Sequence, residues 1–195
     1  MTFDYYGAII YTYLEISKAL KKMKEEYTME TSALRTVSPN GAKKSIMRAF
    51  KKKRPIFMWG PPGIGKSDVV GQITESLKNS HLIDIRLSLW EPTDIKGIPY
   101  YAANDNKMVW AAPAELPDDA MAKKHKKIIL FLDEMNSAAP AVQAAAYQLI
   151  LNRRIGQYKL PDNVYIIAAG NREADKGVTY RMPAPLANRF VHLEL

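Results

Sequence analysis

Residues 60–67 read Gly-Pro-Pro-Gly-Ile-Gly-Lys-Ser, which fits the pattern G-x-x-x-x-G-K-S. Glycines allow tight turns, so backbone N–H groups and the N-terminus of a following helix can surround phosphate oxygens. Lys66 would place a positive charge beside the β- and γ-phosphates, and the Ser67 hydroxyl could ligate Mg²⁺. An apolar run at residues 55–59 precedes the loop and a helix-like stretch follows it, as a phosphate-binding loop requires. The sequence therefore predicts a nucleoside triphosphate site formed by Gly60, Pro61, Pro62, Gly63, Ile64, Gly65, Lys66, Ser67 and Asp68.

Two adjacent carboxylates, Asp133 and Glu134, follow an apolar run at residues 128–132. Ligands of a doubly wound sheet bind beyond the carboxyl ends of its strands, so Asp133 is expected beside Ser67. Asp133 would hold Mg²⁺ through water, because this ion keeps much of its hydration shell. Glu134 would orient and polarise the attacking water. Adjacent acids are common on protein surfaces, and it is the phosphate loop earlier in the chain that favours a catalytic interpretation.

Asn171 follows a third apolar run, at residues 164–169. Its amide can donate or accept a hydrogen bond, so it could lie between the γ-phosphate and the attacking water. Asparagine after a strand is also an ordinary turn residue. In combination with the two motifs above, the sequence predicts that Asn171 takes part in catalysis.

The elements that would position these groups are apolar strands alternating with helices, which indicates a mainly parallel sheet covered on both faces. Core strands are expected at residues 55–59, 81–87, 128–132, 164–169 and 190–195. Helices are expected at residues 42–53, from the phosphate loop to about 79, within 117–122, and at 138–151. Small hairpins are expected at residues 98–110 and 155–160. Residues 1–36 differ from the rest and predict a long amphipathic helix followed by a polar link.

Composition narrows the class of protein. The chain has 195 residues, of which 47% are hydrophobic, enough for one substantial domain. It contains no cysteine, which excludes disulfides, thiolate metal sites and a cysteine nucleophile. No run approaches the roughly 18 apolar residues of a membrane span, and no signal peptide is evident at the start. We therefore expect a cytoplasmic location without a membrane partner.

The formal net charge of +8 is unevenly distributed. Basic clusters occur at residues 21–24, 51–54 and 123–127. Such clusters can bind nucleic acid or another polyanion. Two of them directly precede expected strands, where solvated charges also aid solubility, and no aromatic interleaving accompanies them. The second interpretation is favoured, and nucleic-acid binding stays open.

The motifs together resemble the AAA+ ATPases, and more narrowly their MoxR-like and midasin/dynein-like branch. The resemblance covers about residues 38–195 and rests on residues 60–67, 133–136, 169–171 and 185–190, which occur in the family's order. It implies a three-layer α/β core with a five-stranded parallel sheet in the order 5-1-4-3-2. It also implies that Arg189 acts on the nucleotide of a neighbouring subunit. Residues 91–97 with the hairpin that follows, and residues 152–160, look like insertions of this branch.

The resemblance implies Mg²⁺-dependent hydrolysis of ATP by a hexameric ring that remodels a protein partner, in some relatives one with a von Willebrand factor A domain. The choice of ATP over GTP rests on the resemblance alone. We expect a helical extension at residues 1–36 and an ATPase core at residues 37–195 without the family's helical lid. A nucleic-acid motor or loader is the main alternative. A nucleotide kinase or a binding module is less favoured, because Glu134, Asn171 and Arg189 suit hydrolysis.

Overall fold

The computed structural model describes residues 15, 17–18, 36–175 and 179–195. The chain divides into two compact units, residues 1–35 and residues 36–195. The long helix expected near the N-terminus falls outside the described residues, apart from 15, 17 and 18, which are helical. The fold below is that of the second unit.

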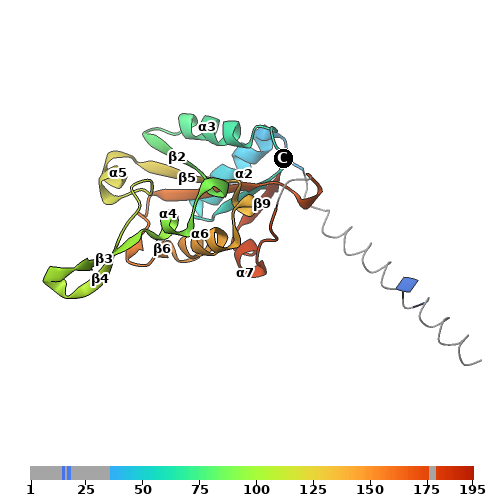
Figure 1. The fold of residues 1–195 in the computed structure, drawn as a ribbon. Coiled ribbons are helices and arrows are strands. Elements are labelled where there is room, and N and C mark those ends of the chain that lie inside the picture. Colours follow the sequence, from blue (N-terminus) through green and yellow to red (C-terminus); the bar gives the residue numbers. More distant parts are fainter. Residues whose placement is uncertain (1–14, 16, 19–35, 176–178) are drawn as a thin grey trace, which may run out of the picture. The chain divides into compact units, whose positions relative to one another are not determined.

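The second unit is built on a five-stranded parallel sheet with the order β2-β5-β8-β1-β9 (Figure 1). Its strands are β1 (Ile56–Trp59), β2 (Ser80–Arg86), β5 (Lys127–Asp133), β8 (Val164–Gly170) and β9 (Val191–Glu194). Counted along the chain as strands one to five, this order reads 5-1-4-3-2 from the β9 edge. The expected fold class and strand order are confirmed.

Helices cover both faces of the sheet. One face carries α2 (Pro39–Lys51) and α3 (Lys66–Ser76), and the other carries α4 (Pro92–Lys96), α6 (Pro140–Asn152) and α7 (Ala184–Ala187). The short helix α5 (Asp119–Lys124) precedes β5. Side chains alternate along a strand, so Leu130 packs in the core beneath α6 while Phe131 packs in the core beneath α2 and α3. Both are fully buried, which explains why the strand sequences are almost continuously apolar.

The first helix of this unit begins three residues earlier than its sequence predicts. Ser38 is the N-cap and its hydroxyl accepts a hydrogen bond from the Gly41 N–H at 3.3 Å. Pro39 occupies the first helical position, where its fixed φ suits the helix and its missing N–H costs nothing. The residues that looked like a turn are therefore the first turn of α2.

The larger hairpin, β3 (Ile98–Ala102) and β4 (Lys107–Ala111), extends away from the sheet in Figure 1. Gly97 enters it with φ +83°, and a Cβ there would lie 1.9 Å from the Ala111 carbonyl oxygen. Only glycine fits this crossing of the two strands. The hairpin exposes large apolar side chains: Ile98, Tyr100, Tyr101, Met108 and Trp110. The second expected hairpin is also present, as β6 (Arg154–Ile155) and β7 (Tyr158–Lys159).

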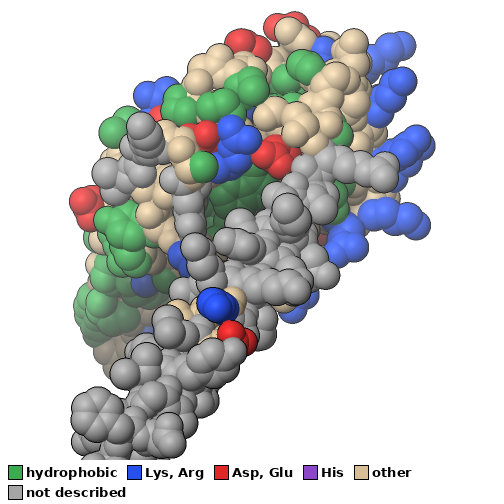
Figure 2. All heavy atoms as spheres, turned by 90° about the vertical axis from the view of Figure 1, so that its right-hand side faces the viewer, with side chains coloured by type: hydrophobic (Ala, Val, Ile, Leu, Met, Phe, Trp, Pro, Cys, Tyr) green, Lys and Arg blue, Asp and Glu red, His purple; other side chains and the backbone are tan. Residues whose placement is uncertain are grey.

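Helix α2 has a basic outer surface. Lys44, Arg48 and Lys51 are exposed and recur at helical spacing, and the helix contains no acidic residue. On the face drawn in Figure 2, Lys and Arg side chains gather along one edge, while hydrophobic side chains dominate the other. The basic run that follows α2 continues this surface to Arg54, which is also exposed.

No helix within residues 36–175 or 179–195 is long and apolar enough to cross a membrane. The carboxyl ends of β5, β8 and β1 lie next to each other at one edge of the sheet, because the three strands are parallel neighbours. The predicted site residues that follow these strands lie at that edge.

Candidate active site

The loop between β1 and α3 is shaped by two glycines. Gly63 and Gly65 adopt φ values of +77° and +87°, in the left-handed region that favours glycine. Gly65 is the N-cap of α3, and no side chain caps this helix. The N–H groups of its first turn are therefore available to an anion, which the helix dipole also favours.

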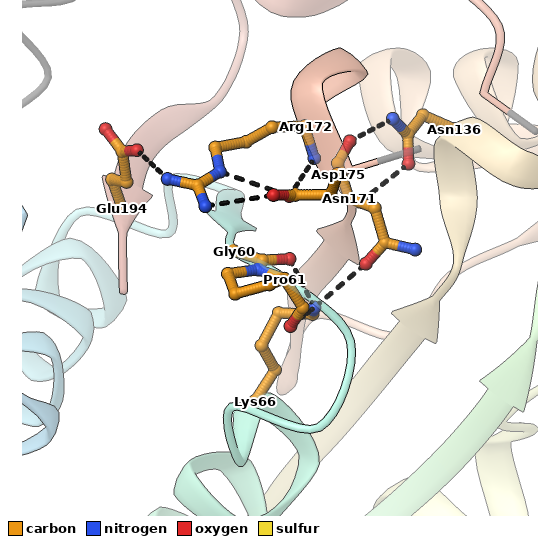
Figure 3. A network of polar contacts seen from close by, with 8 residues as sticks. All are labelled: Gly60, Pro61, Lys66, Asn136, Asn171, Arg172, Asp175 and Glu194. Carbon is orange, nitrogen blue, oxygen red and sulfur yellow. Dashed lines mark hydrogen bonds and ion pairs between the residues drawn. The ribbon is translucent and has the colours of Figure 1, made fainter. Parts of the chain in front are cut away.

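Lys66 lies inside this loop and is only 8% exposed. Its ammonium donates hydrogen bonds to the carbonyl oxygens of Gly60 at 2.7 Å and Pro61 at 3.1 Å, and to Asn171 Oδ1 at 3.1 Å (Figure 3). Burial lowers the pKa of Lys66 below its ordinary value of 10.5, and the nearby carboxylate of Asp133 opposes this shift. A buried ammonium bonded to weak neutral acceptors is well suited to exchange them for phosphate oxygens.

Ser67 and Asp133 bring two oxygen groups together. The Ser67 hydroxyl donates to Asp133 Oδ2 at 3.3 Å, from the first turn of α3 to the last residue of β5. Hydroxyl and carboxylate oxygens are ligands that Mg²⁺ accepts, usually with several waters. Among the described residues there is no cluster of three or more His, Cys, Asp or Glu side chains that could hold a metal. The donor set therefore fits a phosphate-associated Mg²⁺ better than an all-protein cage.

Glu134 has an unusual backbone and a restrained carboxylate. Its φ is +53°, in the left-handed region, where a residue other than glycine stores about 1–3 kcal/mol of strain. Its N–H donates to Asp133 Oδ1 at 2.8 Å. The carboxylate accepts a hydrogen bond from the Ser88 hydroxyl, and its Oε1 lies 3.6 Å from Nε of Arg86. The last residue of β2 and the short turn after it thus hold Glu134 in its present orientation.

Asn171 is held by Asn136, which is 2% exposed. Asn136 Nδ2 donates to the Asn171 carbonyl oxygen at 2.7 Å, and Asn136 Oδ1 accepts from the Asn171 N–H at 3.1 Å. This pair leaves the Asn171 side chain directed at Lys66 (Figure 3).

Arg172 reaches across the end of β1, the strand that leads into the phosphate loop, to contact β9. Its guanidinium donates to Asp175 at 3.0 and 3.1 Å and to Glu194 at 2.8 Å. These hydrogen bonds raise the pKa of Arg172 and lower the pKa of Asp175. Because β1 lies between β8 and β9, the contact to Glu194 joins the two strands that flank the loop strand.

Most of the predicted site residues surround one cavity of about 330 Å³. Its lining consists of Pro62, Gly63, Gly65, Lys66, Ser67, Asp68, Arg86, Asp133, Glu134 and Asn171. Gly60 and Pro61 lie behind it and contribute carbonyl oxygens to Lys66. Ile64 is part of the same loop but is 43% exposed and does not line the cavity.

Arg189 is the one predicted residue that lies elsewhere. It is exposed, two residues before Val191, which pairs with Ile56 at the amino end of β1. The phosphate loop begins beyond the other end of β1, roughly 13 Å away at about 3.3 Å per residue. Arg189 instead lines a second cavity of about 220 Å³ with Lys53, Arg54 and Arg153.

Sequence reasoning missed several residues that shape the site. Arg86 and Ser88 hold Glu134, and Arg172 links Asp175 to Glu194. Each is polar and lies at the end of a strand or just after it, but this signal is shared by many turn residues. Their partners become visible only when the strand order is known.

Comparison of the sequence with known protein families identifies the family of this chain. Residues 55–190 match the family described as AAA domain (dynein-related subfamily). This chain belongs to that family. The expected relationship to AAA+ ATPases of the midasin/dynein-like branch is confirmed, and with it nucleotide binding and ATPase membership at the level of the family.

This AAA domain spans only part of the length of the relatives that it matches. It is 28% identical to midasin of Giardia intestinalis over 190 residues, which is 91% of the chain but 4% of that protein. Its fold matches a proposed ATPase from Cytophaga hutchinsonii, with a TM-score of 0.55, 17% identity and coverage of 93% of this chain and 55% of the other. It also matches NtrX from Brucella abortus, with a TM-score of 0.51, 19% identity and coverage of 93% and 42%. These two likenesses concern the fold.

Proposed function

We propose that this AAA domain hydrolyses ATP with Mg²⁺ in a site completed by a second copy of the chain, and that a hexameric ring of such copies remodels a protein partner. The observation that carries the proposal is the division of the predicted site into two places. Lys66, Glu134 and Asn171 surround one cavity, while Arg189 lies at the opposite end of the sheet. A subunit that carries the phosphate cavity at one end of its strands and Arg189 at the other suits head-to-tail assembly into a closed ring.

The phosphate cavity fits a nucleotide in its charge and its donors. The uncapped first turn of α3 offers N–H groups, and Lys66 offers a buried ammonium. Ser67 and Asp133 offer the oxygen atoms that would hold Mg²⁺, directly or through water. When bound, the ion would neutralise charge that develops on the phosphate oxygens. The preference for ATP over GTP rests on the family.

Hydrolysis would use Glu134 and Asn171. The carboxylate of Glu134 would orient water and accept its proton as the oxygen bonds to the γ-phosphorus and the bond to the β-phosphate oxygen breaks. Glu134 must first leave Ser88 and Arg86, which now occupy its oxygens. Asn171 would contact the γ-phosphate once Lys66 has exchanged its protein acceptors for phosphate.

Arg189 would act on the nucleotide of the adjacent copy. The cavity that it lines contains three further basic residues, Lys53, Arg54 and Arg153, beside Pro55 and three aliphatic residues. Its positive charge favours an anionic group. A guanidinium stabilises the charge that develops during phosphoryl transfer, which affects turnover more than ground-state binding.

A protein partner is supported by the β3–β4 hairpin. Its large exposed side chains are apolar and aromatic, and its charged residues Asp105 and Lys107 pair with each other at 3.3 Å. A projecting apolar ribbon without net charge suits contact with a polypeptide better than contact with phosphates. A partner with a von Willebrand factor A domain is one form that this role takes in the family's MoxR-like members.

A nucleic-acid-dependent ATPase is the second candidate, and the basic surface of α2 favours it. Lys44, Arg48 and Lys51 follow one exposed stripe with no acidic residue between them. Phosphate contacts of this kind would make binding depend steeply on salt.

ATP hydrolysis measured against protein concentration, with and without DNA and at two salt concentrations, tests both candidates. The proposal expects specific activity that rises steeply with concentration, since sites are shared between copies. Activity that is independent of protein concentration, together with a protein that stays monomeric in size-exclusion chromatography, would contradict the shared site. Strong stimulation by DNA that is lost at higher salt would favour the second candidate.

A further inference from the structure

Asn136 connects the segment that follows β5 to the segment that follows β8 through a pair of hydrogen bonds. It lies two residues after Glu134, in the turn Met135–Ser137, and its amide bonds both backbone groups of Asn171 at 2.7 and 3.1 Å. The side chain is almost fully buried. A buried amide whose donor and acceptor are both used fixes its partner more strictly than a surface contact, because each lost bond leaves an unsatisfied group.

The surroundings of Asn136 are fitted to this contact. A Cβ on Gly170 would lie 2.2 Å from Asn136 Oδ1, so a residue larger than glycine at this position would displace the amide. The Asn136 carbonyl oxygen also accepts from the Tyr180 N–H at 2.7 Å. The turn after Glu134 is thereby tied both to Asn171 and to the segment that leads toward α7.

We propose that Asn136 is a positioning residue for hydrolysis. It directs the Asn171 side chain at the γ-phosphate and fixes the position of Asn171 relative to Glu134. The inference rests on the function proposed above. Asn136 does not line the phosphate cavity, so it acts through Asn171 rather than on the substrate. Displacement of a catalytic group by about 1 Å can reduce a rate about a hundredfold, so a small shift of Asn171 has a measurable effect.

The test is Asn136→Leu, which keeps the side-chain volume and removes both hydrogen bonds. Turnover should fall at least about tenfold while affinity for ADP changes little. The preference for a non-hydrolysable ATP analogue over ADP, measured by titration, should fall as well, because Asn171 senses the γ-phosphate. Gln143→Met is the matched control, since Gln143 is a similarly buried amide whose side chain, among the described residues, bonds only the Ala138 carbonyl oxygen. It should leave turnover and the nucleotide preference unchanged.

Combination with Asn171→Ala separates positioning from general stability. If Asn136 acts through the Asn171 side chain, the double variant should turn over ATP at the rate of Asn171→Ala alone. Equal losses in both backgrounds, or unchanged turnover and nucleotide preference in Asn136→Leu, would overturn the inference. If Asn136→Leu does not fold, Asn136→Asp, which keeps the acceptor, takes its place under the same criteria. Failure of the proposed function itself would appear differently, as a wild-type protein without ATPase activity.

Discussion

Two glycine-to-alanine substitutions should have opposite effects on stability. Gly170 ends β8 against the Asn136 amide, where an added Cβ would meet Oδ1 at 2.2 Å and the Phe57 ring at 2.8 Å. Gly71 lies within α3, where an added Cβ meets nothing within 4 Å. The same chemical change therefore introduces a clash at one position and removes only backbone freedom at the other.

The magnitudes follow from these contacts. Gly170→Ala requires Asn136 to move by about 1 Å and the Phe57 ring by less, and such overpacking costs about 1–3 kcal/mol. Gly71→Ala should stabilise the protein by about 0.5–1 kcal/mol, because alanine is the better helix former and restricts the unfolded chain. For a protein of this size, 1 kcal/mol shifts the midpoint of thermal unfolding by roughly 2–4 °C. We expect a fall of roughly 2–12 °C for Gly170→Ala and a rise of a few degrees for Gly71→Ala.

Thermal unfolding followed by circular dichroism at one protein concentration measures both effects, and ATPase assays of the same samples measure function. Turnover should drop in Gly170→Ala, because the displaced Asn136 no longer holds Asn171, and should be retained in Gly71→Ala. The packing described for Gly170 would be refuted by wild-type stability and turnover in Gly170→Ala. A loss of stability in Gly71→Ala would show that the surroundings of α3 are crowded.

Three further predictions concern the phosphate cavity. Lys66→Ala should weaken binding of a fluorescent ATP analogue at least about tenfold, or about 1.4 kcal/mol, since the loop loses its buried ammonium. Equal affinity would show that this loop does not bind the triphosphate. Burial lowers the pKa of Lys66, so triphosphate affinity should decline as pH rises toward 10.5 and the nucleotide-free protein loses this proton. Lys66→Arg, which stays charged, should show a flatter profile over the same range, and identical profiles would argue against titration of Lys66. Glu134→Gln should bind ATP with nearly unchanged affinity and hydrolyse it much more slowly, because an amide cannot accept the proton of water. Turnover at the wild-type rate would assign the catalytic carboxylate to another residue.

The fold could be predicted well from the sequence, for physical reasons. Strands buried on both faces read as apolar runs, and the phosphate loop marks where the first of them ends. The strand order came from the resemblance to AAA+ ATPases, since periodicity alone does not state which strands are neighbours. The start of α2 was misjudged because Ser38 and Pro39 are typical both of turns and of helix starts.

The polar partners within the site could not be predicted. Asn136 and Asn171 are 35 residues apart, and Glu134 and Ser88 are 46 apart. They meet because β5 lies between β2 and β8, a fact of tertiary structure that local sequence does not contain. Arg189 was identified through the family motif, and its distance from Lys66 follows from the parallel register of β9 with β1.

The most direct test of the shared site is a mixing experiment with Glu134→Gln and Arg189→Ala. Each variant alone should hydrolyse ATP slowly. In an equal mixture that assembles at random, roughly one interface in four would combine an intact Glu134 with an intact Arg189 of the next copy. The account predicts activity that exceeds the sum of the two variants and peaks at intermediate ratios. Activity equal to that sum at every ratio, with both variants shown to assemble together, would contradict a site completed by a second copy.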